Sequence, residues 1–166
     1  MKSNLVLTGM SGAGKSTLGV LLAKALGLDF VDTDIEIQNR EGRLLQEIID
    51  ADGVEPFLEI EERIVSSLRI RGSVVATGGS VVYSEKIMSA LSADGRIIYL
   101  SVPFDELMGR LKDITTRGIV IKNGSTLRDV YDERLPLYEK YADLVFDCSG
   151  KGIEQCVAGL VAAAGD

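Results

Sequence analysis

The stretch Gly9-Met10-Ser11-Gly12-Ala13-Gly14-Lys15-Ser16 has the spacing G-x-x-x-x-G-K-[ST] of a phosphate-binding loop. Its glycines let the backbone turn tightly, so that N–H groups converge on phosphate oxygens. Lys15 provides a point charge for the β- and γ-phosphates, and Ser16 offers a hydroxyl to Mg²⁺. We expect the contacts to a nucleotide to come from Gly12, Ala13, Gly14, Lys15, Ser16 and Thr17.

The residues on either side of the loop support this interpretation. Residues 5–8 form a short apolar run that is typical of a buried strand, and residues 16–26 have helical spacing up to Gly27. A helix that begins at the loop adds partial positive charge, which favours bound phosphate. A chance glycine-rich turn is the alternative, and the complete motif between a strand and a helix disfavours it.

Strands and helices alternate along the rest of the chain. We expect further strands at residues 28–32, 73–77, 96–100 and 144–147, and helices at 35–50 with a break near Gly42, 55–71, 84–93, 104–112, 127–141 and 153–164. This order predicts one α/β domain, residues 1–166, with a parallel sheet and helices on both faces. Ligands bind at the carboxyl ends of such strands, where the loop, residues 32–34 and residues 77–80 fall.

Charge and composition exclude several classes of function. The net charge of −7 argues against a nucleic-acid partner. No run is long enough to span a bilayer and no signal peptide precedes the first strand, so we expect a cytoplasmic protein. The chain has no histidine, which removes the serine and cysteine triads and leaves a carboxylate as the general base. Cys148 and Cys156 are expected to be reduced thiols.

Asp32 and Asp34 are candidates for work at the phosphates. If the second strand extends through both, their side chains share one face, because side chains alternate along a strand. One carboxylate near Ser16 could support Mg²⁺, and the other could accept a proton from an attacking hydroxyl. The alternative is a solvated pair that caps the following helix. Arg117 lies in residues 113–126, which we interpret as a mobile loop. It is a candidate to close over the phosphates, and the alternative is that it is a solvated loop cation.

These stretches together make the chain resemble the shikimate kinases over nearly its full length. The resemblance rests on residues 9–16, Phe30-Val31-Asp32-Thr33-Asp34, Ala76-Thr77-Gly78-Gly79, and Glu133-Arg134-Leu135-Pro136-Leu137-Tyr138 followed by Ala142-Asp143. It implies a P-loop fold of the nucleoside-monophosphate-kinase type, with five parallel strands and a lid at about 113–126. It also implies phosphorylation of shikimate by ATP, in aromatic amino acid biosynthesis, by a protein that we expect to be a monomer.

The resemblance implies roles for residues on the donor side of the site. Lys15 and Ser16 handle the phosphates of ATP and Mg²⁺, and Asp32 supports the metal. Arg110 lies against the adenine, and Arg117 is the lid arginine, which contacts ATP and acts in catalysis with Lys15. A guanine-binding switch is disfavoured, because the chain has no Asn-Lys-x-Asp element after a strand.

On the acceptor side, Asp34 contacts the acceptor hydroxyl and acts as the base, and Arg134 binds the acceptor carboxylate. The other residues expected in this pocket are Leu58, Glu61, Gly78, Gly79 and Ser80.

Two positions in the acceptor pocket depart from the family pattern. Leu58 stands where the pattern Phe-Arg-x-x-Glu has an arginine, and Ser80 replaces a third glycine. Loss of a charge-assisted bond on the order of 1.5–3 kcal/mol predicts roughly 10- to 100-fold weaker shikimate binding, unless Arg134 compensates. Leu58 and Glu61 share a helix face, so removal of the cation leaves that corner negative. A different acceptor is therefore the alternative, such as the hydroxy amino acid homoserine or a sugar acid.

Overall fold

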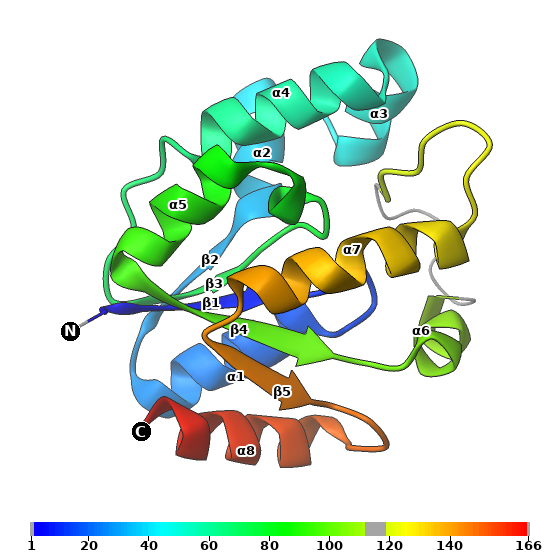
Figure 1. Ribbon diagram of the computed structural model, residues 1–166. Helices are drawn as coiled ribbons and strands as arrows, with labels where there is room; N and C mark the ends of the chain where they lie inside the picture. Colours follow the sequence, from blue (N-terminus) through cyan, green and yellow to red (C-terminus); the bar gives the residue numbers. More distant parts are fainter. Residues whose placement is uncertain (1, 112–118, 166) are drawn as a thin grey trace.

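A five-stranded parallel sheet forms the centre of the protein in the computed structural model, which describes residues 2–111 and 119–165 (Figure 1). The strands are β1 (Asn4–Thr8), β2 (Asp29–Asp32), β3 (Ser73–Ala76), β4 (Gly95–Ser101) and β5 (Leu144–Asp147). Their order in the sheet is β2-β3-β1-β4-β5, and all four neighbouring pairs are parallel. β1 is therefore the middle strand, and the loop that follows it emerges at the centre of the carboxyl edge.

Helices cover both faces of this sheet. They are α1 (Lys15–Leu26), α2 (Thr33–Glu41), α3 (Leu45–Asp52), α4 (Val54–Val65), the short 3₁₀ helix η1 (Val81–Tyr83), α5 (Glu85–Asp94), α6 (Phe104–Leu111), α7 (Leu127–Tyr141) and α8 (Ile153–Ala164). α1 and α8 pack together on one face, while α5 and α7 contact β4 from the other. Within residues 2–111 and 119–165, no helix is long and apolar enough to cross a membrane.

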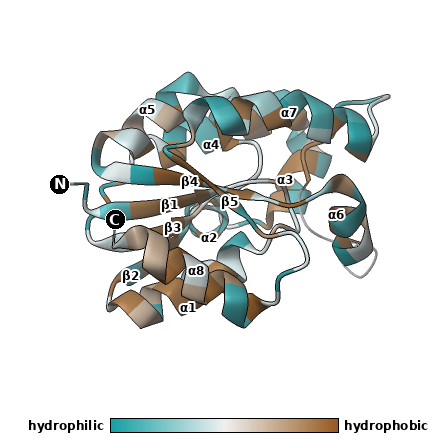
Figure 2. Ribbon diagram, turned by 60° about the horizontal axis from the view of Figure 1, so that its bottom comes forward, coloured by the Kyte–Doolittle hydropathy of each residue, from teal (hydrophilic) through white to brown (hydrophobic). Residues whose placement is uncertain are grey.

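The central strands carry the core. Figure 2 shows apolar strands between the two helical layers, as expected for a parallel sheet that is covered on both faces. The side chains of these strands that are at most 1% exposed include Val6, Leu7, Val74, Val75, Ile97 and Ile98. These side chains fix the sheet, and the sheet holds its carboxyl-end loops in place.

The predicted fold class is confirmed, with one clear difference in a helix boundary. α4 ends at Val65 and not near residue 71. The hydroxyls of Ser66 and Ser67 donate hydrogen bonds to the carbonyl oxygens of Glu62 and Ile64. Such local side-chain bonds compete with continued helix, which explains the early end.

Candidate active site

The phosphate-binding loop is curved as its sequence predicts. Gly12 and Gly14 have φ values of 87° and 94°, in the left-handed region that favours glycine. Lys15 Nζ donates hydrogen bonds to the carbonyl oxygens of Gly9 at 2.6 Å and Met10 at 2.8 Å. The lysine therefore bridges the loop from the inside, and α1 begins at this residue with its N-terminus directed at the loop.

Ser16 and Asp32 lie side by side next to the loop. Ser16 Oγ donates a hydrogen bond to Asp32 Oδ2 at 2.7 Å. Asp32 Oδ1 accepts from the backbone N–H groups of Asp34 and Ile35, so that Asp32 also caps α2. The capping interpretation and the position beside Ser16 therefore both apply to Asp32.

Asp34 is not on the strand, so the condition under which Asp32 and Asp34 would share a strand face is not met. β2 ends at Asp32, and Asp34 lies in the first turn of α2. This turn nevertheless brings Asp34 to the carboxyl end of β3. A Cβ on Gly78 would lie 2.8 Å from Asp34 Oδ1 and 3.0 Å from Glu61 Oε2. A side chain at position 78 would therefore displace one or both of these carboxylates.

A cavity of about 450 Å³ opens beside the loop. Its lining includes the predicted residues Gly12, Gly14, Lys15, Ser16, Asp34, Glu61, Gly78, Gly79, Ser80 and Arg134. Sequence reasoning missed other lining residues, among them Gln38, Leu44, Leu45, Gln46, Phe57, Thr77 and Val120. Phe57 is the first residue of the Phe-x-x-x-Glu stretch, which could have indicated that it lines the pocket. Nothing in the sequence indicates the same for Gln38 and Gln46.

Arg134 is a fully buried cation at this cavity, with 0% exposure. Its Nε donates to the hydroxyl of Tyr83 at 3.2 Å, and its Nη2 donates to the carbonyl oxygen of Val120 at 2.9 Å. A Cβ on Gly79 would lie 2.8 Å from Nη1, so a side chain there would displace the guanidinium. No carboxylate of the described ranges forms an ion pair with Arg134. Such a buried charge favours an anionic ligand.

Glu61 is a nearly fully buried carboxylate, 1% exposed, at the same cavity. Ser80 Oγ donates a hydrogen bond to Glu61 Oε1 at 2.8 Å, and Oε2 has no hydrogen-bond partner within the part of the chain that the structure describes. Burial raises the pKa of Glu61 to about 7, and the nearby charge of Asp34 adds to the rise. The Ser80 bond and the charge of Arg134 act in the opposite direction.

Leu58 does not line this cavity. It lies in a neighbouring hollow of about 120 Å³, together with Tyr83, Lys122 and other residues, and Val120 lines both spaces. The helix face that Leu58 shares with Glu61 therefore does not place the two side chains in one pocket.

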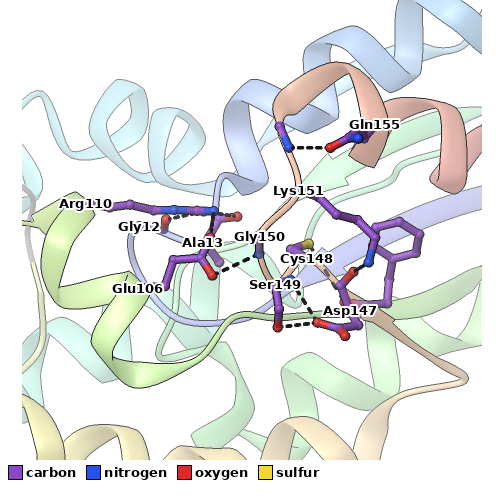
Figure 3. A network of polar contacts seen from close by, with 12 residues as sticks. Gly12, Ala13, Glu106, Arg110, Asp147, Cys148, Ser149, Gly150, Lys151 and Gln155 are labelled. Carbon is purple, nitrogen blue, oxygen red and sulfur yellow. Dashed lines mark hydrogen bonds and ion pairs between the residues drawn. The ribbon is translucent and has the colours of Figure 1, made fainter.

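A third space, of about 330 Å³, lies on the other side of the loop. Its lining includes the predicted nucleotide contacts Gly12, Ala13, Gly14, Thr17 and Arg110, and also Cys148, Lys151, Gly152, Ile153 and Cys156. Arg110 Nη1 donates to the carbonyl oxygens of Gly12 and Ala13, and Nη2 forms an ion pair of 2.9 Å with Glu106 (Figure 3). Glu106 also accepts from the backbone N–H of Gly150. The segment after β5 thus completes a cavity for which sequence reasoning named only the loop and Arg110, the latter from the family resemblance.

Arg117, predicted to act over the phosphates, lies outside the described residues. The described end of the expected lid contributes Val120 to the acceptor-side cavity and Thr126 to the N-cap of α7.

Comparison with known proteins places this geometry in context. The family model for shikimate kinase matches residues 11–164. The chain is 39% identical to the shikimate kinase of Histophilus somni, covering 87% of this chain and 85% of that protein. It is 40% identical to that of Pseudomonas entomophila, with 87% and 86% covered. Among solved structures, shikimate kinase from Acinetobacter baumannii in complex with shikimate superposes with a TM-score of 0.87 at 26% identity, covering 98% of this chain and 92% of that one.

Proposed function

Because the chain belongs to the shikimate kinase family, we propose that it transfers the γ-phosphoryl group of ATP to shikimate and yields shikimate 3-phosphate. The observation that carries the proposal is one cavity that holds Lys15 of the phosphate-binding loop, the carboxylate Asp34 and the buried cation Arg134. Shikimate offers both groups that such a cavity requires, a hydroxyl as nucleophile and a carboxylate as anion. The family match does not favour homoserine or a sugar acid as the acceptor.

The proposed reaction is a direct in-line transfer. Asp34 accepts the proton of the attacking hydroxyl, whose oxygen forms a bond to the γ-phosphorus while the bond to the bridging oxygen of ADP breaks. Lys15 Nζ offsets the charge on the phosphoryl oxygens, and we assign the same task to Arg117. Positioning of the two substrates in one cavity supplies much of the remaining acceleration.

The acceptor is held from the other residues of the cavity. Arg134 binds the shikimate carboxylate, and its bonds to Tyr83 and Val120 support this role because they fix the guanidinium before the ligand arrives. Gly78 and Gly79 lack side chains that would fill the space beside Asp34 and Arg134. Arg110 is assigned to the adenine side.

Oxygen donors beside the loop fit Mg²⁺, and we propose that Ser16 and Asp32 hold it together with the ATP phosphates. Mg²⁺ prefers oxygen ligands and is commonly bound by one or two carboxylates plus substrate phosphates. In residues 2–111 and 119–165 there is no group of three or more His, Cys, Asp or Glu side chains that could hold a metal ion. When bound, Mg²⁺ neutralises charge on the β- and γ-phosphates. We propose ATP as the donor. We also expect the protein to be a monomer that acts in the cytoplasm.

A coupled ADP-release assay tests the proposal. Shikimate, homoserine, serine, threonine and gluconate are compared as acceptors under the same ATP and Mg²⁺ concentrations. We expect turnover with shikimate that exceeds every other acceptor. Turnover of an amino acid or of gluconate, with none of shikimate, would refute the proposed acceptor while leaving a kinase.

A further inference from the structure

The hydrogen bond between Ser80 and Glu61 is not accounted for by phosphoryl transfer itself. Resting on the proposed function, we propose that Ser80 is a positioning residue for acceptor binding. Its hydroxyl holds the Glu61 carboxylate so that Oε2 accepts a hydrogen bond from an acceptor hydroxyl adjacent to the one that Asp34 deprotonates. The site would then select a carboxylic acid that carries two neighbouring hydroxyls.

The backbone does not require glycine at position 80. Ser80 has φ −89° and ψ −5°, which lies outside the left-handed region that favours glycine. At Gly78 and Gly79, by contrast, a Cβ would lie 2.8 Å from Asp34 Oδ1 or Arg134 Nη1. The side chain of Ser80 is only 5% exposed, and its hydroxyl donates a hydrogen bond to Glu61.

Among the described residues, the side chain of Glu61 accepts its hydrogen bond from Ser80, through Oε1, while Oε2 has no partner. The cation that the family pattern has three residues earlier is replaced by Leu58, which lies in the neighbouring hollow. The charged groups at the cavity are Asp34 from α2, Arg134 from α7 and Lys15 from the loop. Within the described residues Arg134 forms no ion pair with Glu61, and we assign the orientation of this carboxylate to the hydrogen bond from the Ser80 hydroxyl.

The unpartnered Oε2 atom of Glu61 indicates the kind of group that Glu61 and Ser80 together would bind. A buried carboxylate oxygen without a donor is unfavourable, and a ligand hydroxyl that donates to it relieves this penalty. Oε2 and Asp34 Oδ1 flank the same point beside Gly78. Two hydroxyls on adjacent carbons of one acceptor can reach two oxygens placed in this way.

The test compares Ser80→Ala with Ser84→Ala. Ser84 is a matched control, because its hydroxyl donates to Glu62, the residue next to Glu61 on α4. We expect Ser80→Ala to raise the KM for shikimate roughly 10-fold, the scale of one hydrogen bond to a charged group, with kcat and the KM for ATP within about 2-fold. Ser84→Ala should leave the KM for shikimate unchanged.

A double-mutant cycle separates positioning from a general loss of structure. We expect Ser80→Ala to add nothing in a Glu61→Ala background, which removes the acceptor of the Ser80 hydrogen bond, and to have no effect on an analogue of shikimate that lacks the neighbouring hydroxyl. Ser80→Gly, which also removes the hydroxyl, should reproduce the rise if Ser80→Ala folds poorly. Additive effects, or an unchanged KM for shikimate in both Ser80 variants, overturn the proposed role of Ser80 and leave the proposed function intact. A wild-type protein that does not turn over shikimate overturns the proposed function, and this inference with it.

Discussion

The buried carboxylate of Glu61 makes the stability of the protein depend on pH. Burial raises its pKa from an ordinary value near 4.5 to about 7. Between these two values the folded protein keeps a proton on Glu61 that the unfolded chain releases, so the free energy of unfolding falls as the pH rises. The stabilisation is complete below the unfolded pKa and is lost as the pH rises through the folded pKa.

Glu61→Gln removes this dependence while keeping an oxygen that can accept from Ser80. One pKa unit corresponds to about 1.4 kcal/mol, so the wild type should lose roughly 2–3 kcal/mol relative to Glu61→Gln between about pH 5 and about pH 8.5. The measurement is urea unfolding of both proteins across this range, without ligand. Glu59→Gln is the control, because Glu59 lies on the same helix but is exposed.

Parallel pH curves for the wild type and Glu61→Gln would refute the reasoning, because Glu61 would then titrate alike in the folded and unfolded chains. A difference that grows in the opposite direction would mean that Arg134 and Ser80 outweigh burial. Either result would mean that Glu61 ionises in the folded protein at a lower pH than its burial predicts.

Three further predictions concern the site and the core. Asp34→Asn should lower kcat at least ~100-fold with ATP affinity little changed, as measured by single-turnover kinetics and nucleotide titration; an unchanged kcat removes Asp34 from its role. Arg134→Lys should raise the KM for shikimate roughly 10-fold or more but not the KM for ATP, since a lysine cannot reproduce the planar fork; equal effects on both substrates would argue for a structural role. Gly19→Ala should lower the free energy of unfolding by about 1–3 kcal/mol, because its Cβ would lie 2.7 Å from Phe30 Cε2. Gly109→Ala, where nothing lies within 4 Å, should be neutral or stabilising in the same denaturant series.

The sequence predicted the donor side of the site better than the acceptor side. The loop at residues 9–16 is local, so that its glycines, Lys15 and Ser16 identify it without tertiary information. The acceptor cavity joins Asp34, Glu61 and Arg134 from three helices, and their packing depends on contacts distant in sequence. The helical spacing of Leu58 and Glu61 therefore suggested one pocket. In the structure the two residues line separate cavities, and Val120 lines both of them.

The second strand does not extend from Asp32 to Asp34 for a local reason. The carboxylate of Asp32 accepts hydrogen bonds from the N–H groups of Asp34 and Ile35, and this cap starts α2 directly after the strand. A cap of this kind was recognised as an alternative, but the sequence does not reveal that one aspartate can cap α2 and also accept from Ser16.

The only two cysteines of the chain, Cys148 and Cys156, both line the cavity beside Arg110. Burial raises the pKa of the Cys148 thiol to about 12, so alkylation at neutral pH should be slow. An adenine seated in that cavity would cover both sulfur atoms and slow alkylation further. If adenine binds there as we propose, alkylation of these two thiols would report nucleotide occupancy, and mass spectrometry could follow it without any added label on the enzyme or the nucleotide.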